Sequence, residues 1–174
     1  ENGTAVVETR EPGGAEGAEA IRRLLVEGDP GRWSAETEIL LFTAARRDHL
    51  ERRIAPALAD GATVLCDRFV DSTRVYQGAA RAELRGTVDA LHALMIGIEP
   101  DLTLILDLDP GTAVARGAAR GGVEDRFERF GPAFQARLRD GFLALAAEFP
   151  ERCRVVPADG PAEAVAARVA EALT

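Results

Sequence analysis

The sequence has 174 residues, 47% of them hydrophobic and 29% charged, which is the composition of an ordinary globular protein with one sizeable core. A formal net charge of −8 argues against a protein that wraps long nucleic acid, and no stretch approaches the roughly 18 apolar residues of a membrane span. All 21 basic residues are arginines. We therefore expect any bound phosphate to be held by guanidinium groups or backbone N–H groups.

Short apolar runs alternate with longer amphipathic stretches along the chain. The expected strands are Thr4–Thr9, Ala62–Cys66, Leu102–Asp107 and Cys153–Pro157. The expected helices are Ala15–Glu27, Ala35–Ala59, Arg85–Gly97, Gly111–Arg120, Gly131–Phe149 and Pro161–Leu173. This alternation predicts an α/β fold with a parallel sheet in a single domain over residues 1–174. The nearly continuous apolar run LTLILDLD is typical of a strand that is covered on both faces.

Three of the expected strands lead into loops that carry charge, namely REPGG, DRFVDST and DLDPG. In parallel sheets, ligands bind beyond the carboxyl ends of the strands. The loops therefore indicate either a site for an anionic ligand or ordinary polar turns, and composition alone favours neither interpretation.

The second of these loops is the most informative. Asp67 ends an apolar strand, where P-loop enzymes place an acidic residue near Mg²⁺, and Arg68 can offer a planar fork to a phosphate. Taken alone, the pair could equally be a solvated Asp-Arg step before a helix. Further hydroxyl and amide groups follow within one short stretch: Ser72, Thr73, Tyr76 and Gln77.

Two other stretches carry candidate binding residues. Phe42 and Arg46 are four apart on an expected helix and share a face, which suits a stacked base with a polar exocyclic group. Helical spacing alone favours the alternative that Phe42 is core and Arg46 a surface ion-pair partner. Residues 116–130 contain Arg116, Arg120 and a Gly-Gly step, and indicate either a mobile lid over phosphates or an exposed, charge-paired loop.

The cysteines and histidines give no sign of metal or nucleophilic chemistry. Cys66 and Cys153 adjoin apolar runs, so we expect two buried thiols in a reducing compartment, which places the protein in the cytoplasm. His49 and His92 lie in expected helices without ligands at metal spacing, and we interpret both as structural or surface residues. The sequence contains no G-x-S-x-G, H-E-x-x-H or CxxC motif.

Taken together, these stretches resemble bacterial thymidylate kinase. The resemblance rests on TREPGG, TEILLFTAARRDH, PALADGATVLCDRFVDSTRVYQG, PDLTLILDLDP, RGGVEDRFE and LALAAEFPERCRVV, in the family's order. It implies a three-layer P-loop nucleoside-monophosphate-kinase fold. It also implies transfer of the ATP γ-phosphoryl group to dTMP, giving dTDP, with Mg²⁺ as cofactor and a homodimer as the assembly.

The resemblance also implies a role for each matching residue. Phe42 would stack on thymine, Arg46 would hydrogen-bond the base, and Arg68 would grip the dTMP phosphate with Asp67 near Mg²⁺. Tyr76 would border the deoxyribose and discriminate against a ribose 2′-OH. The remaining acceptor-side residues would be Pro12, Ser72, Thr73 and Gln77. In the lid, Arg120 and then Arg116 and Arg126 would meet ATP phosphates, and Arg68, Asp67 and Arg120 would carry catalysis.

The sequence departs from the family in three places. Ala15 follows REPGG where the family usually has Thr, and AARAE follows YQG where Gly-rich sequence is usual. The strand, G-x-x-x-x-G-K-[ST] loop and helix that open the family's fold, roughly 25–35 residues, are absent from these 174 residues. We expect that strand to be central in the sheet, and the 174 residues to be part of a longer natural protein. The alternatives are a catalytically impaired remnant that binds dTMP only, and a kinase for another nucleoside monophosphate.

Overall fold

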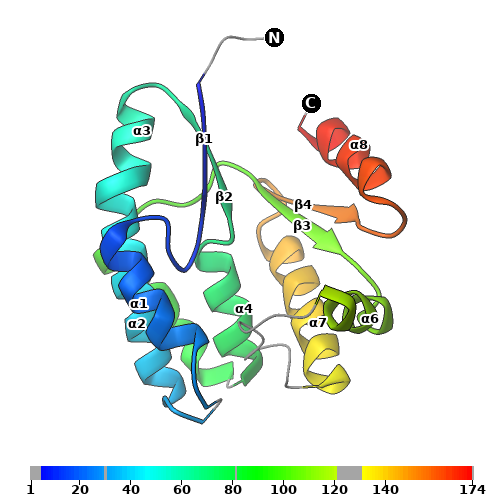
Figure 1. Ribbon diagram of the computed structural model, residues 1–174, viewed down its shortest axis with the longest axis horizontal. Helices are drawn as coiled ribbons and strands as arrows, with labels where there is room; N and C mark the ends of the chain where they lie inside the picture. The colour runs from blue at the N-terminus through cyan, green and yellow to red at the C-terminus, as the bar shows by residue number, and fades with distance from the viewer. Residues whose placement is uncertain (1–4, 30, 81, 121–130, 174) are drawn as a thin grey trace. The chain divides into compact units, whose positions relative to one another are not determined.

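Figure 1 shows a computed structural model of the protein, which describes residues 5–29, 31–80, 82–120 and 131–173. Its contacts divide the chain into two compact units, Glu1–Ile98 (unit 1) and Glu99–Thr174 (unit 2). Each unit has its own pair of strands and its own helices, and the two are described separately. The expected single domain over the whole chain stays a prediction.

Unit 1 is built on two parallel strands, β1 (Val6–Arg10) and β2 (Thr63–Asp67). Their register pairs Val6 with Thr63 and Arg10 with Asp67, and the backbone N–H of Glu11 continues it by donating to the carbonyl of Asp67 at 2.9 Å. The loops REPGG and DRFVDST therefore begin side by side, as the sequence predicted for parallel strands.

Helices α1 (Glu16–Val26) and α2 (Ala35–His49) pack against each other in unit 1. Ser34 begins α2 by accepting a hydrogen bond from the backbone N–H of Thr37, which satisfies one of the donors left open at a helix start. The expected helix over residues 35–59 continues past α2, but as a π-helical stretch η1 (Leu50–Ile54) followed by a short α3 (Ala55–Ala59).

Helix α4 (Val70–Ala80) was not among the expected elements, because its inward face is largely polar and shows no apolar periodicity. A 3₁₀ turn, η2 (Ala82–Leu84), connects it to α5 (Arg85–Met95). The core of unit 1 forms where these helices meet α2, η1 and the strands. It includes two clusters, Ile39, Val70, Leu84 and Val88 in one and Leu50, Ile54 and Ile96 in the other, and Phe69 packs against both.

Unit 2 contains the parallel strands β3 (Thr103–Asp107) and β4 (Cys153–Pro157) with helices α6 (Pro110–Arg120), α7 (Pro132–Glu148) and α8 (Ala162–Ala172). Helix α7 packs on both strands and α8 on β4. The expectation that β3 is covered on both faces is wrong at Leu106. This residue is 54% exposed, whereas its neighbour Ile105 is buried. No helix in the described ranges is long and apolar enough to cross a membrane.

Candidate functional site

A buried ion pair lies where the loop after β1 meets α2. The Nε of Arg46 donates to Oε2 of Glu11 at 2.7 Å, and the two side chains are only 3% and 4% exposed. The alternative that Arg46 is a surface ion-pair partner is therefore wrong in its location, although Arg46 does form an ion pair. Two charges removed from water are tolerated only with good geometry and further hydrogen bonds.

Those further hydrogen bonds are present on both sides of the ion pair. The Nη2 of Arg46 donates to the Thr73 hydroxyl at 2.9 Å. On the other side, His49 Nδ1 lies 3.2 Å from Oε1 of Glu11, and His49 Nε2 lies 2.7 Å from the Thr9 hydroxyl. We refer to these five residues as the Arg46 cluster. Glu11, Arg46, His49 and Thr73 are each at most 5% exposed, and the interpretation of His49 as a structural residue agrees with this burial.

The Arg46 cluster leaves one side of the guanidinium open. Nε and Nη2 are engaged, and among the described residues Nη1 has no hydrogen-bond partner. The Arg46 guanidinium also lies over the ring of Phe69, 5.2 Å from its centroid. Phe42, one turn earlier on α2, is half-buried. Arg46 therefore has up to two N–H groups for a ligand acceptor while the rest of its side chain is fixed.

Gln77 supplies an acceptor close to this donor. It lies one turn beyond Thr73 on α4, a helix that packs against α2. Its Nε2 is 3.5 Å from Oε2 of Glu38, and within the described part of the chain its Oε1 is buried without a hydrogen-bond partner. Because a buried unpaired oxygen costs free energy, it is a natural acceptor for a ligand N–H.

Arg68 adopts a backbone conformation that non-glycine residues rarely take, with φ of +68°. Its Nη1 donates to the Tyr76 hydroxyl at 3.1 Å, and its guanidinium lies 5.4 Å from the centre of that ring. The Cys66 thiol donates to the Arg68 carbonyl at 3.0 Å, and burial raises the pKa of Cys66 to about 12, so the donor keeps its proton. Strained residues held in this way cluster at ligand sites.

The REPGG loop is fastened to α1 and to the Arg46 cluster. Arg22 donates to the Pro12 carbonyl at 2.7 Å. The Gly14 N–H donates to Glu19 at 2.9 Å, and this bond lowers the pKa of the Glu19 carboxyl. Gly14 has φ of +85°, and a Cβ there would come within 2.4 Å of His49 Nε2, so the loop needs glycine at this position.

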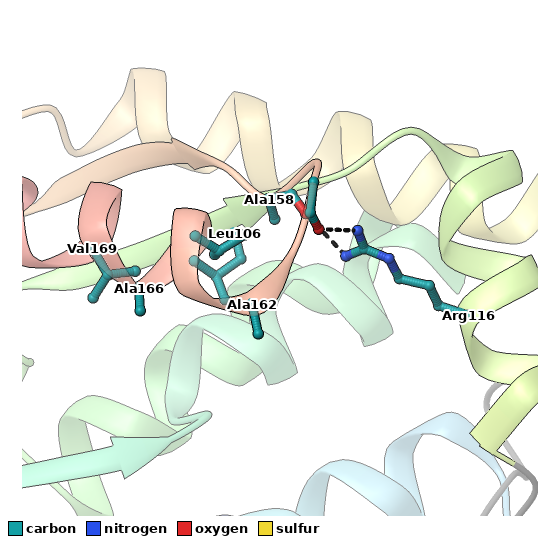
Figure 2. Close-up of a pocket in the computed structure, with 8 residues that line it drawn as sticks. Leu106, Arg116, Ala158, Ala162, Ala166 and Val169 are labelled. Atoms are coloured by element: carbon teal, nitrogen blue, oxygen red, sulfur yellow. Dashed lines mark hydrogen bonds between the residues drawn. The ribbon is translucent and has the colours of Figure 1, made fainter.

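In unit 2 the predicted lid residues fall at the edge of the described chain. Arg116 on α6 donates to the carbonyls of Ala158 at 3.0 Å and Gly160 at 2.8 Å (Figure 2). The groove beside it is lined by Leu106 and by a face of α8. The side chain of Arg120, the last residue of α6, lies outside the described residues, as does Arg126.

Sequence reasoning missed several residues that the structure brings into these contacts. Glu11 was read only as part of a polar turn, and its pairing with Arg46 spans 35 positions. In unit 2, Arg139 forms two hydrogen bonds to the Asp107 carboxylate, at 2.6 and 2.9 Å, and lowers its pKa. For Glu11, the sequence offered one signal of a role in the site, namely its position directly after a strand.

Comparisons with known proteins identify the family. The model of the thymidylate kinase family matches residues 1–169. The curated thymidylate kinase of Jannaschia sp. is 68% identical over 160 residues, covering 92% of this chain and 77% of its own length. This chain belongs to the thymidylate kinase family. A second thymidylate kinase, from Ruegeria pomeroyi, is 63% identical over 169 residues, covering 97% of this chain and 80% of its own.

The fold of the thymidylate kinase family is confirmed by a solved structure. The crystal structure of thymidylate kinase from Ehrlichia chaffeensis matches with a TM-score of 0.74 at 34% identity, covering 97% of this chain and 80% of that one. The expected P-loop nucleoside-monophosphate-kinase class is therefore correct, and the chain is a phosphotransferase of the thymidylate kinase family that uses ATP as phosphoryl donor.

Proposed function

We propose that the protein transfers the γ-phosphoryl group of ATP to dTMP, giving dTDP, and that unit 1 holds the dTMP. The single observation that carries this proposal is the pairing of an available Arg46 donor with the buried, unpartnered acceptor of Gln77 on adjacent helices. Relatives at 68% and 63% identity that are named thymidylate kinase support it.

The donor and acceptor of this pair suit thymine. Its O4 accepts a hydrogen bond and its N3–H donates one, so Arg46 Nη1 and Gln77 Oε1 would both be satisfied. Cytosine has a 4-amino donor and an N3 acceptor, so the Arg46 donor would face another donor and the Gln77 acceptor would face another acceptor. In this proposal Phe42 stacks on the base, and Thr73, already bonded to Arg46, borders it.

The phosphate and sugar would lie at the DRFVDST loop. Arg68, with an exposed guanidinium beside Tyr76, would bind the dTMP phosphate. Tyr76 would face the deoxyribose, with Ser72 nearby on the same helix. Pro12, whose carbonyl is held by Arg22, would lie near the base.

Mg²⁺ is compatible with one carboxylate of this site. The described residues contain no group of three or more side chains that could hold a metal ion. However, Mg²⁺ in kinases is usually held by one or two carboxylates together with substrate phosphates and water. Asp67 is exposed at the end of β2 and fits this role. When bound, the ion would neutralise phosphate charge, and Arg68 would hold the acceptor phosphate beside it.

On the donor side, the proposal assigns the ATP phosphates to Arg120, Arg116 and Arg126. Arg116 would exchange its present contacts with two backbone carbonyls for phosphate oxygens. Phosphates are stronger acceptors than carbonyls for a guanidinium, which favours that exchange.

We also propose a homodimer through α2 and α5. Leu40 on α2 is 57% exposed and Leu94 on α5 is 79% exposed, and these helices are connected by the bond from Arg47 to the Met95 carbonyl at 2.8 Å. Sedimentation should show a dimer that Leu94→Glu dissociates; a monomeric wild-type protein would contradict the proposed dimer.

The cytoplasm is proposed as the compartment because Cys66 and Cys153 are free thiols, of which Cys153 is buried and Cys66 half-buried.

The test of the proposed function is a coupled assay of ADP release with dTMP, dUMP, dCMP, dGMP and AMP as acceptors. We expect dTMP to give the highest kcat/KM. Turnover with another monophosphate but not with dTMP would contradict the acceptor assignment. Calorimetry showing dTMP binding without any transfer would support the remnant alternative, which the comparisons do not favour.

A further inference from the structure

Glu11 is engaged on both of its carboxylate oxygens, although we assign it no contact with a substrate. Oε2 accepts from Arg46 Nε at 2.7 Å and Oε1 faces His49 Nδ1 at 3.2 Å, in a residue that is 5% exposed. We propose that Glu11 is a positioning residue, which fixes the Arg46 guanidinium so that it discriminates between bases, and that His49 and Thr9 fix Glu11 in turn. This inference rests on the proposed function.

Two anchors determine the position of the remaining Arg46 donors. The guanidinium is planar and rigid, so the Nε bond to Glu11 and the Nη2 bond to Thr73 together fix its plane and its rotation. Nη1 is then held in one place. Without Glu11, the guanidinium could turn about its long side chain and donate to a different ligand group.

His49 and Thr9 complete the chain of hydrogen bonds behind Glu11. An ionised carboxylate only accepts, so we assign a proton to His49 Nδ1, and the Thr9 hydroxyl, which can donate or accept, pairs with His49 Nε2 at 2.7 Å. The histidine ring is completely buried, and the close approach of Gly14 restricts its rotation. Each member of the chain therefore orients the next, from Thr9 through His49 to Glu11 and Arg46.

The ratio of dTMP to dCMP affinity tests the positioning role, because a purely structural role of Glu11 would leave this ratio unchanged. Glu11→Gln keeps the size of the side chain but places an amide NH₂ against a donor of Arg46 or His49. Calorimetry should then show the ratio of dTMP to dCMP affinity falling about tenfold, the value of one charged hydrogen bond. The ratio of dTMP to dUMP affinity should stay unchanged, because both bases carry O4 and N3–H.

Asp71→Asn is the matched control. Asp71 pairs with Arg74 at 2.9 Å, with side chains 5% and 6% exposed, so this ion pair is as buried as that of Glu11. It should lower stability like Glu11→Gln and leave the dTMP/dCMP ratio at the wild-type value. A folded Glu11→Gln protein with the wild-type ratio, or an equal fall in the control, would overturn the inference.

Two further variants keep the test decisive. If Glu11→Gln fails to fold, Thr9→Val removes only the hydroxyl at the end of the chain of hydrogen bonds. It should lower the ratio of dTMP to dCMP affinity about twofold and shift the Arg46 Nε–H resonance. An unchanged ratio and an unchanged resonance would overturn the inference.

Arg46→Met separates this inference from the proposed function on which it rests. If Arg46→Met lowers the ratio and Glu11→Gln does not, only the positioning role of Glu11 fails. A wild-type protein without any dTMP/dCMP preference would contradict the proposed function itself.

Discussion

The two units hold their arginines differently beside the carboxyl ends of their strands. In unit 1, Arg46 is 3% exposed and is fixed by hydrogen bonds to Glu11 and Thr73. In unit 2, the Arg139 side chain is 40% exposed and pairs with Asp107, and Arg116 is exposed and, among the described residues, bonded only to backbone carbonyls. A buried arginine that is fixed by two hydrogen bonds keeps one geometry, whereas a surface arginine exchanges partners at small cost. The first suits recognition of a base, and the second suits holding phosphates.

Arg46→Met should have the largest effect on this contrast. Removing the cation leaves the Glu11 carboxylate buried without a counter-charge, so the free energy of unfolding should fall by about 3–5 kcal/mol, and the affinity for dTMP should fall by at least about tenfold. Denaturant unfolding and calorimetry measure the two effects. The control is the adjacent Arg47→Met, whose exposed ion pair with Glu51 should contribute at most about 1 kcal/mol. Equal, small losses in both variants would remove the distinction between the two kinds of arginine.

Arg68→Gly should separate function from stability within unit 1. Glycine adopts the positive φ of +68° without strain, so the variant should be as stable as the wild type or more stable by up to about 1 kcal/mol. Its affinity for dTMP should nevertheless fall, because the phosphate loses its guanidinium. Arg68→Ala should lose the same affinity and be less stable than Arg68→Gly. Wild-type dTMP affinity in both variants would contradict the role of Arg68.

Arg116→Ala tests the unit 2 side of the comparison. The loss of its bonds to Ala158 and Gly160 should lower the free energy of unfolding by about 1 kcal/mol. ATP affinity should fall and dTMP affinity should not change. A drop in dTMP affinity alone would instead place this arginine with the acceptor.

The smallest expected effect is a pH dependence of unit 2. The hydrogen bonds from Arg139 lower the folded-state pKa of Asp107 below its unfolded value. The resulting stabilisation is present above the unfolded pKa, near about 4, and is lost as the pH falls through the folded pKa. In Asp107→Asn, the melting temperature should therefore fall less steeply as the pH is lowered, with a difference from the wild type of a few degrees at most. Thermal scans from about pH 6 down to about pH 3 measure this, and an unchanged acid limb would exclude the Asp107 contribution.

The strands and most helices could be predicted because their apolar patterns are local. Helix α4 could not, since Asp71, Thr73, Arg74 and Gln77 are buried on its inward side and replace the apolar stripe. Thr73, Arg74 and Gln77 each have a partner on another helix, as in the bond from Arg74 to Asp89 at 2.8 Å. Such partners are set by tertiary packing, which periodicity does not report.

The candidate site shows the same limit. Helical spacing placed Phe42 and Arg46 on one face, and the end of β2 placed Asp67 and Arg68 together. Their roles came from the resemblance to thymidylate kinase and stay predictions. The pairing of Arg46 with Glu11 could not be read from the sequence, because a glutamate in a polar turn looks solvated until the fold buries it.

Hydrogen exchange with and without dTMP tests the central claim most directly, namely that unit 1 forms the acceptor site. We predict that dTMP slows exchange in the REPGG loop, the second half of α2 and the first turns of α4, and leaves residues 131–173 unchanged. Protection confined to unit 2, or uniform protection that Arg46→Met does not reduce, would contradict it.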